Sequence, residues 1–138
     1  METLVHNDLK VREMYEAFNR GDIEAIIGEM HPKVDFKVMG APDIPYAGHY
    51  KGINEVRRFF TEMAKHIEYS EMDPDHFFEK SSNGKDLVVV TGNAKGRVLK
   101  TGKTTESPWC MIFEFDDDGR ITRFRDIFDT LNEAKAFK

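Results

Sequence analysis

The segment GRITRFRDIFDT, residues 119–130, places an acidic side chain between two aromatic ones. If this segment is a β-strand, successive side chains point to opposite faces, so Phe124, Asp126 and Phe128 share one face. The two aromatic rings indicate that this face is buried. Burial disfavours the charged form of a carboxyl group and raises its pKa, which suits a group that transfers protons. The sequence therefore predicts Asp126 as a general acid or base inside the fold.

A structural role for Asp126 is the alternative. A buried carboxylate can pair with an arginine such as Arg97, or accept hydrogen bonds from a neighbouring loop, and so merely satisfy the core. Buried carboxylates often have such roles, so the sequence leaves both interpretations open.

The elements that must position this aspartate begin with helices. Residues 7–18 and 22–30 carry apolar side chains at helical spacing and predict an αα-hairpin, with Asn7 and Asp22 as N-caps. His31 and Pro32 end the hairpin, and alternation over residues 34–38 then predicts a half-buried strand.

The rest of the chain changes from helix to strands. Residues 40–52, GAPDIPYAGHYKG, predict a loop, and residues 53–66 a third helix capped near Asn54. Strands are expected over residues 76–80, 87–98, 106–115 and 119–130, with turns at 81–84, 101–103 and 116–119. This order predicts an α+β fold with three helices on one face of a curved antiparallel sheet. Such a layout leaves a hollow that suits a ligand.

Three phrases of the sequence resemble the SnoaL-like group of the nuclear transport factor 2-like superfamily: MYEAFNRGDIEAIIGEMHP, PYAGHYKGINEVRRFF and PWCMIFEFDDDGRITRFRDIFDT. The resemblance spans nearly the whole chain, and with the length it predicts one SnoaL-like domain over residues 1–138. It implies a cone-shaped α+β barrel around a mostly apolar pocket, dimerising through the outer sheet face. Relatives include polyketide cyclases, limonene epoxide hydrolase, ketosteroid isomerase and non-catalytic binding domains.

The resemblance also narrows the chemistry. Ketosteroid isomerase uses a tyrosine and two aspartates, and the matching positions here are the apolar Met14, Val38 and Met111. Asp126 resembles the last-strand aspartate that serves as acid or base in cyclase-like and epoxide-hydrolase-like members, although the strand SPWCMIFEF lacks the arginine and second aspartate of an epoxide hydrolase. The resemblance implies a cofactor-independent isomerase or cyclase acting on a carbonyl compound. The alternatives are a non-catalytic binding module for a hydrophobic metabolite and an epoxide-hydrolase-like enzyme.

Further candidates surround the expected pocket. His49 lies in a loop that borders the pocket mouth in this superfamily, and its imidazole could relay a proton to Asp126; a solvated loop histidine is the alternative. Tyr46 offers a hydroxyl donor, and Trp109 could stack on a flat ring or simply fill the core. The remaining ligand-binding candidates share apolar or aromatic character, which also suits an ordinary core: Tyr15, Phe18, Phe59, Met63, Met111, Phe124 and Phe128.

The composition argues against other classes of function. The 138 residues carry a formal net charge of -5, so no basic surface for nucleic acid or anionic membrane is expected. Apolar runs such as residues 87–90 are too short to cross a bilayer, and the first ten residues lack a signal core, so we expect a cytoplasmic protein. The scattered histidines, the single cysteine and the absence of a phosphate-binding glycine loop predict neither metal nor cofactor.

The face of the last strand opposite Asp126 carries Arg123, Arg125 and Ile127. Together with carboxylates such as Glu114 these residues could form the outer face of the sheet, and two such faces meeting about a dyad would be buried. We therefore expect a homodimer; a solvent-facing ladder of salt bridges in a monomer is the alternative.

Overall fold

A six-stranded sheet with strand order β2-β1-β6-β5-β4-β3 is the scaffold of the molecule. The structure is a computed structural model that describes residues 7–82 and 85–138, so the predicted turn residues Asn83 and Gly84 lie outside the described residues. The strands are β1 (Met30–Val38), β2 (Gly48–Lys51), β3 (Ile67–Ser82), β4 (Lys85–Val98), β5 (Thr104–Phe115) and β6 (Ile121–Phe128). All neighbouring strands are antiparallel except β1 and β6, which are parallel.

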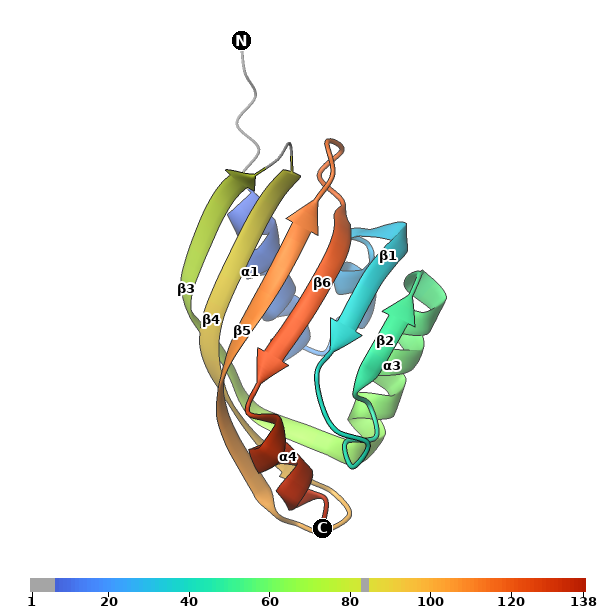
Figure 1. Ribbon diagram of the computed structural model, residues 1–138, viewed down its shortest axis with the longest axis vertical. Coiled ribbons are helices and arrows are strands. Elements are labelled where there is room, and N and C mark those ends of the chain that lie inside the picture. Colours follow the sequence, from blue (N-terminus) through green and yellow to red (C-terminus); the bar gives the residue numbers. More distant parts are fainter. Residues whose placement is uncertain (1–6, 83–84) are drawn as a thin grey trace.

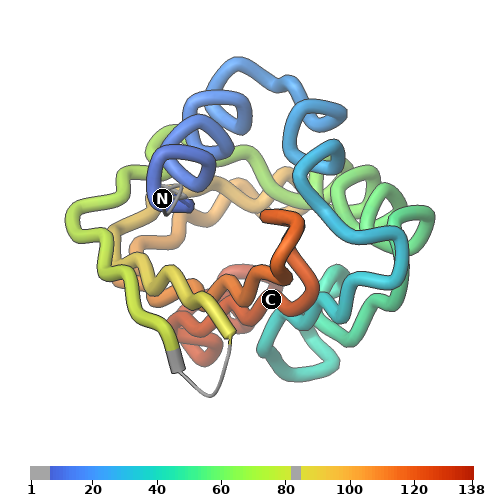
Figure 2. The backbone as a smooth tube through the Cα atoms, turned by 90° about the horizontal axis from the view of Figure 1, so that it is seen from above, coloured from blue at the N-terminus to red at the C-terminus, as the bar shows by residue number. Residues whose placement is uncertain are grey.

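The helices are α1 (Asn7–Asn19), α2 (Ile23–Ile27), α3 (Ile53–His66) and α4 (Thr130–Ala136). Figure 1 shows α1 and α3 behind the sheet and α4 at its lower end, and Figure 2 shows α1 and α2 on the side opposite the central strands. The predicted cap of the second helix is confirmed, because the Asp22 side chain accepts a hydrogen bond from the Ala25 N–H at 3.2 Å. Among the described residues, no helix is long and apolar enough to cross a bilayer.

This arrangement is the predicted cone-shaped α+β fold: helices pack on a curved, mostly antiparallel sheet. The long β3 and β4 pair over their whole length, and the register of β3 shifts near Tyr69 and again near Pro74. Such irregularities bend a strand and increase its twist. They also break the alternation of apolar residues, which is why the sequence predicted only residues 76–80 of this strand.

Other boundaries differ from the predictions for local reasons. The α3 helix begins after Gly52, whose φ of 83° favours glycine, and not after a cap at Asn54. Met30, expected on a helix, opens β1 instead. The predicted loop over residues 40–52 contains β2, which pairs with β1 and so depends on a tertiary contact. The α4 helix was not predicted.

The core lies between the helices and the concave face of the sheet. Its fully buried members come from both layers, for example Val11 of α1, Val56 of α3, Val88 of β4 and Ile121 of β6. Phe36 of β1 stacks on Phe124 of β6 with ring centroids 4.4 Å apart, which fixes the two parallel strands against each other.

Candidate active site

A cavity of about 90 Å³ lies between α1, α3 and the concave face of the sheet. Its walls are aromatic rings, thioethers and one isoleucine, and Asp126 is the one carboxyl group among them. The lining residues are Met14, Tyr15, Phe18, Ile26, Met30, Phe36, Phe59, Phe60, Met63, Tyr69, Met72, Met111, Phe113, Phe124 and Asp126. An apolar cavity with few polar groups is the usual form of a small-molecule site.

Strand β6 positions Asp126 at the wall of this cavity. Asp126 pairs with Val38 on the parallel neighbour β1 and with Met111 on β5, so the Asp126 backbone is held on both sides. Alternation then turns Phe124 and Asp126 to the concave face. The Oδ1 atom of Asp126 is buried and has no hydrogen-bond partner.

The structure does not provide the arginine partner of the alternative reading. Arg97 pairs with Glu68 at 3.4 Å, on the exposed side of the β3–β4 pair. Within residues 7–82 and 85–138, no basic side chain forms an ion pair with Asp126. Asp126 as a residue is half-buried, but a carboxyl group with one buried oxygen left unpaired is still costly for stability, which favours a chemical role.

The environment of Asp126 favours its protonated form. Burial, and then the nearby charge of Glu133, raise the pKa of Asp126 from 3.8 to about 8. A carboxyl group with this pKa is present in both protonation states near neutral pH, which is the condition for efficient proton transfer.

A second, smaller chamber of about 20 Å³ shares Asp126 with the main cavity as a lining residue. It is more polar than the main cavity, because hydroxyl groups and a second carboxyl group line it. We call it the side chamber, and its lining residues are Tyr69, Met72, Ala94, Thr105, Ser107, Trp109, Met111, Asp126, Phe128 and Glu133. The buried Trp109 Nε1 atom has no hydrogen-bond partner.

Glu133 reaches the side chamber from α4. The helix begins after Asp129, whose side chain accepts a hydrogen bond from the Asn132 N–H at 3.0 Å and whose own N–H donates to Ser107 Oγ at 2.9 Å. These bonds hold the short helix against β5 and turn Glu133 inward, where only 5% of it is exposed. Glu133 accepts hydrogen bonds from Tyr46 at 2.9 Å and from Tyr69 at 3.4 Å.

The sequence analysis missed Glu133. The ending DTLNEAKAFK carries a helix cap and helix-forming residues, but a glutamate on a short terminal helix is usually solvated. Its burial results from contacts with distant tyrosines, and no local pattern of residues signals such contacts.

The structure distributes the predicted ligand-binding residues over three places. Six line the main cavity: Tyr15, Phe18, Phe59, Met63, Met111 and Phe124. Trp109 and Phe128 line the side chamber instead. Tyr46 lines neither space, is 1% exposed, and donates its hydroxyl to Glu133.

Tyr15 is a polar residue of the main cavity whose hydroxyl makes only a weak hydrogen bond. Its hydroxyl donates to the Met111 thioether at 2.9 Å, and sulfur is a poor acceptor. Its ring stacks on Trp109 with centroids 5.4 Å apart. Burial, followed by the charges of Asp126 and Cys110, raises the pKa of Tyr15, so this hydroxyl remains a donor at neutral pH.

A family model described as the SnoaL-like domain matches residues 11–124. The chain belongs to the SnoaL-like domain family. A nuclear transport factor 2-like protein of unknown function from Burkholderia pseudomallei has a TM-score of 0.82 and 26% identity, over 98% of this chain and 99% of that one. No curated protein matches the chain.

Two further solved structures share the fold of this SnoaL-like chain. A candidate polyketide cyclase from Pseudomonas putida has a TM-score of 0.75 and 16% identity, over 96% of this chain and 98% of that one. TerC, co-crystallised with polyporic acid, has a TM-score of 0.73 and 23% identity, over 95% of this chain and 97% of that one. At these identities the likeness shows the fold alone.

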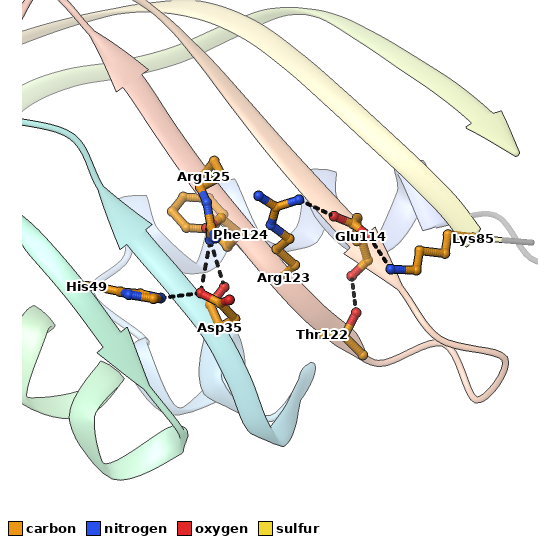
Figure 3. Close-up of polar contacts among 8 residues, drawn as sticks. All are labelled: Asp35, His49, Lys85, Glu114, Thr122, Arg123, Phe124 and Arg125. Carbon is orange, nitrogen blue, oxygen red and sulfur yellow. Dashed lines mark hydrogen bonds and ion pairs between the residues drawn. The ribbon is translucent and has the colours of Figure 1, made fainter. Parts of the chain in front are cut away.

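The SnoaL-like fold here places His49 away from Asp126. Strand β2 pairs His49 with Lys37 of β1 and turns Tyr50 into the core, so alternation directs His49 outward. In Figure 3 the His49 ring points to Asp35, which also accepts a hydrogen bond from Arg125 at 3.1 Å. The predicted proton relay from His49 therefore has no geometric support. It assumed a loop at residues 48–51, and these form a strand.

The charged side chains in Figure 3 belong to the outer face of the sheet. Glu114 accepts from Arg123 at 3.2 Å and pairs with Lys85 at 3.3 Å. Burial opposes the charge of Asp35, but hydrogen bonds from His49 and Arg125 outweigh it and lower the pKa of Asp35. In the part of the SnoaL-like chain that the structure describes, no three acidic, histidine or cysteine side chains cluster as metal ligands.

Proposed function

We propose that the chain is a cofactor-independent enzyme of the isomerase or cyclase type, with Asp126 as general acid and base on a carbonyl compound bound in the main cavity. The observation that carries this proposal is a carboxyl group in the wall of an apolar cavity, whose buried Oδ1 atom has no hydrogen-bond partner and whose pKa is raised to about 8. Desolvated carboxyl groups of this kind serve as proton carriers in other enzymes.

The chemistry needs one proton carrier and no redox partner. The carboxylate form of Asp126 removes a proton from the carbon next to a carbonyl group, and the resulting acid returns that proton to the oxygen or carbon where negative charge collects. An isomerisation or an aldol-type cyclisation of this kind only rearranges atoms within the substrate. Protons and electrons therefore balance without a co-substrate.

Two further features support a carbonyl ligand. The Tyr15 hydroxyl, held only by a thioether, could transfer its hydrogen bond to a ligand oxygen and stabilise the charge that develops there. Phe36, Phe59 and Phe124 provide flat apolar walls that suit a planar or hydrophobic compound. The names of two structural neighbours, a candidate polyketide cyclase and a protein crystallised with polyporic acid, point to the same class of ligand.

The test begins with thermal-shift screening of aromatic, terpenoid and polyketide-like carbonyl compounds. A compound that stabilises the wild type is then incubated in D₂O, and NMR follows exchange of protons next to its carbonyl group. We expect Asp126→Asn to slow this exchange about 100-fold or more, while the compound still binds. Asp117→Asn, the same chemical change on the exposed turn between β5 and β6, is the matched control and should exchange at the wild-type rate.

Equal exchange in the wild type and in Asp126→Asn would contradict the proposal. If a compound binds tightly but neither protein exchanges its protons, the chain is the non-catalytic binding module of the alternative reading. Epoxide hydrolysis is less well supported, because the main cavity holds one carboxyl group and no arginine.

We also propose that the chain forms a homodimer through the outer face of the sheet. Ile127, 42% exposed, lies on this face beside the ion pairs of Arg123 and Arg125. Light scattering is expected to give twice the chain mass of 16.0 kDa, and Ile127→Glu to return the mass of one chain. Leu9→Glu, an equal change on α1, should leave the dimer intact; a wild type of single-chain mass contradicts the proposal.

A further inference from the structure

Glu133 is a buried acidic residue to which the proposed chemistry assigns no role. Tyr46 donates to one of its carboxyl oxygens at 2.9 Å and Tyr69 to the other at 3.4 Å. Tyr46 is a core residue in the loop before β2, and Tyr69, on β3, is partly buried and packs against the core. The charged form of Glu133 is therefore solvated by two hydroxyl groups that the fold itself holds in place.

Asp126 lines the same side chamber, but no hydroxyl group donates a hydrogen bond to its Oδ1 atom. Its Oδ1 atom has no hydrogen-bond partner, although both carboxyl groups line one space of about 20 Å³. Two carboxyl groups in one small buried space do not both ionise readily, because like charges repel strongly where water is excluded. The group with hydrogen-bond donors takes the charge, and the group without them keeps the proton.

We infer that Glu133 is a positioning residue for Asp126: as a carboxylate held by Tyr46 and Tyr69, it keeps Asp126 protonated and makes it the acid of the resting site. The inference rests on the proposed function for its catalytic meaning. The order in which Glu133 and Asp126 lose their protons is a property of the protein without ligand and does not depend on that function.

Glu133 is the one charged group near Asp126 at neutral pH among the described residues that act on it. The ionisable groups that act on Asp126 or feel its charge are Tyr15 of α1, Tyr69 of β3, Cys110 of β5 and Glu133 of α4. Burial raises the pKa of Tyr15, Tyr69 and Cys110, so these three stay neutral near pH 7. The flanking side chains of β1 and α3 at the main cavity, such as Phe36 and Phe60, are apolar.

The order of ionisation follows from these contacts. Burial raises the pKa of Glu133, but the hydrogen bonds from Tyr46 and Tyr69 oppose that rise. Burial and the Glu133 charge both act upward on the pKa of Asp126. Glu133 therefore loses its proton at a lower pH than Asp126, and the pair carries one negative charge at neutral pH. Asp126 is therefore mostly protonated in the resting site at neutral pH, and the carboxylate form that removes a proton next to a carbonyl group is its minor form.

The experiment is a pH titration of side-chain carboxyl groups by ¹³C NMR on the full chain without ligand. In the wild type we expect Glu133 to titrate below Asp126; the reverse order overturns the inference. In Glu133→Gln we expect the midpoint of Asp126 to fall by about 1 pH unit or more. Glu114→Gln, the same change at a buried glutamate of the outer face, should leave that midpoint in place.

A milder variant tests the tyrosine contacts separately. Tyr46→Phe removes one donor from the Glu133 carboxylate and should raise the midpoint of Glu133. An unchanged Asp126 midpoint in Glu133→Gln, or an unchanged Glu133 midpoint in Tyr46→Phe, overturns the inference. Because no substrate is present, a negative result in the D₂O exchange experiment would reject the proposed catalysis and leave this titration result standing.

Discussion

Asp126→Asn is expected to remove most of the pH dependence of stability between pH 5 and pH 7. The folded chain holds the Asp126 proton up to a pKa of about 8, whereas the unfolded chain releases it near the ordinary value of 3.8. Between these values the folded state binds one proton more than the unfolded state. The free energy of unfolding therefore falls by about 1.4 kcal/mol for each pH unit, or about 3 kcal/mol from pH 5 to pH 7.

The sign of this effect separates Asp126 from ordinary surface carboxylates. The stabilising contribution of the retained proton is complete below the pKa of the unfolded chain and is lost as the pH rises through about 8. Asp35 and Asp75 act in the opposite direction, because their lowered pKa values stabilise the fold above their ordinary range and lose that effect in acid. Their influence lies below about pH 5 and does not mask that of Asp126, whereas Glu133, whose pKa is also raised by burial, acts in the same direction as Asp126.

The asparagine side chain of Asp126→Asn cannot ionise, so its effect on stability does not change with pH. The curves of unfolding free energy against pH for the wild type and for this variant are therefore expected to cross. At pH 5 the variant should be equal to or less stable than the wild type, because a buried amide without partners costs about 1–3 kcal/mol. At pH 8 it should be the more stable protein. Urea midpoints followed by the fluorescence of the single tryptophan, Trp109, measure both curves. Asp117→Asn is the control, and wild-type and Asp126→Asn curves of equal slope would contradict a buried, proton-retaining Asp126.

The orientation of Asp126 could be predicted because it depends on a local rule. Side chains alternate along a strand, and the rings of Phe124 and Phe128 marked one face of β6 as buried. The same rule correctly assigned Arg123 and Arg125 to the outer face, where the structure pairs them with Glu114 and Asp35. The α+β layout was predictable from turns, caps and apolar periods, and the SnoaL-like fold from the resemblance of three sequence phrases to that group.

The parts that could not be predicted depend on contacts between distant segments. His49 faces outward because residues 48–51 add a strand to the edge of β1, and a loop rich in glycine and proline gives no sign of this pairing. Glu133 is buried because α4 folds back beneath β5 and meets Tyr46 and Tyr69. The sequence therefore predicted the inward-facing Asp126 and missed Glu133, the second carboxyl group that lines the side chamber.

Gly92→Ala, which adds one methyl group beside Trp109 and the side chamber, is expected to lower the stability of the fold strongly. Gly92 on β4 lies between its partners Pro74 on β3 and Trp109 on β5. A methyl group there would lie 2.3 Å from Trp109 Cζ2 and 2.4 Å from the backbone oxygen of Asp73. The indole could move, but the backbone oxygen belongs to the β3–β4 ladder and could not move without breaking it. We expect a loss of about 3 kcal/mol, at the upper end of the range for overpacked cores.

The same substitution should weaken ligand binding without changing any ionisable group. Trp109 stacks on Tyr15 and borders the side chamber with Asp126, so a displaced indole moves one wall of each space. Native Trp109 fluorescence should shift, and the affinity for a compound found by thermal-shift screening should fall. Gly96→Ala is the control on the same strand: its methyl group meets side-chain atoms at 3.1 Å, which yield more easily. Equal losses in the two variants would show that Gly92 has no special role in seating Trp109.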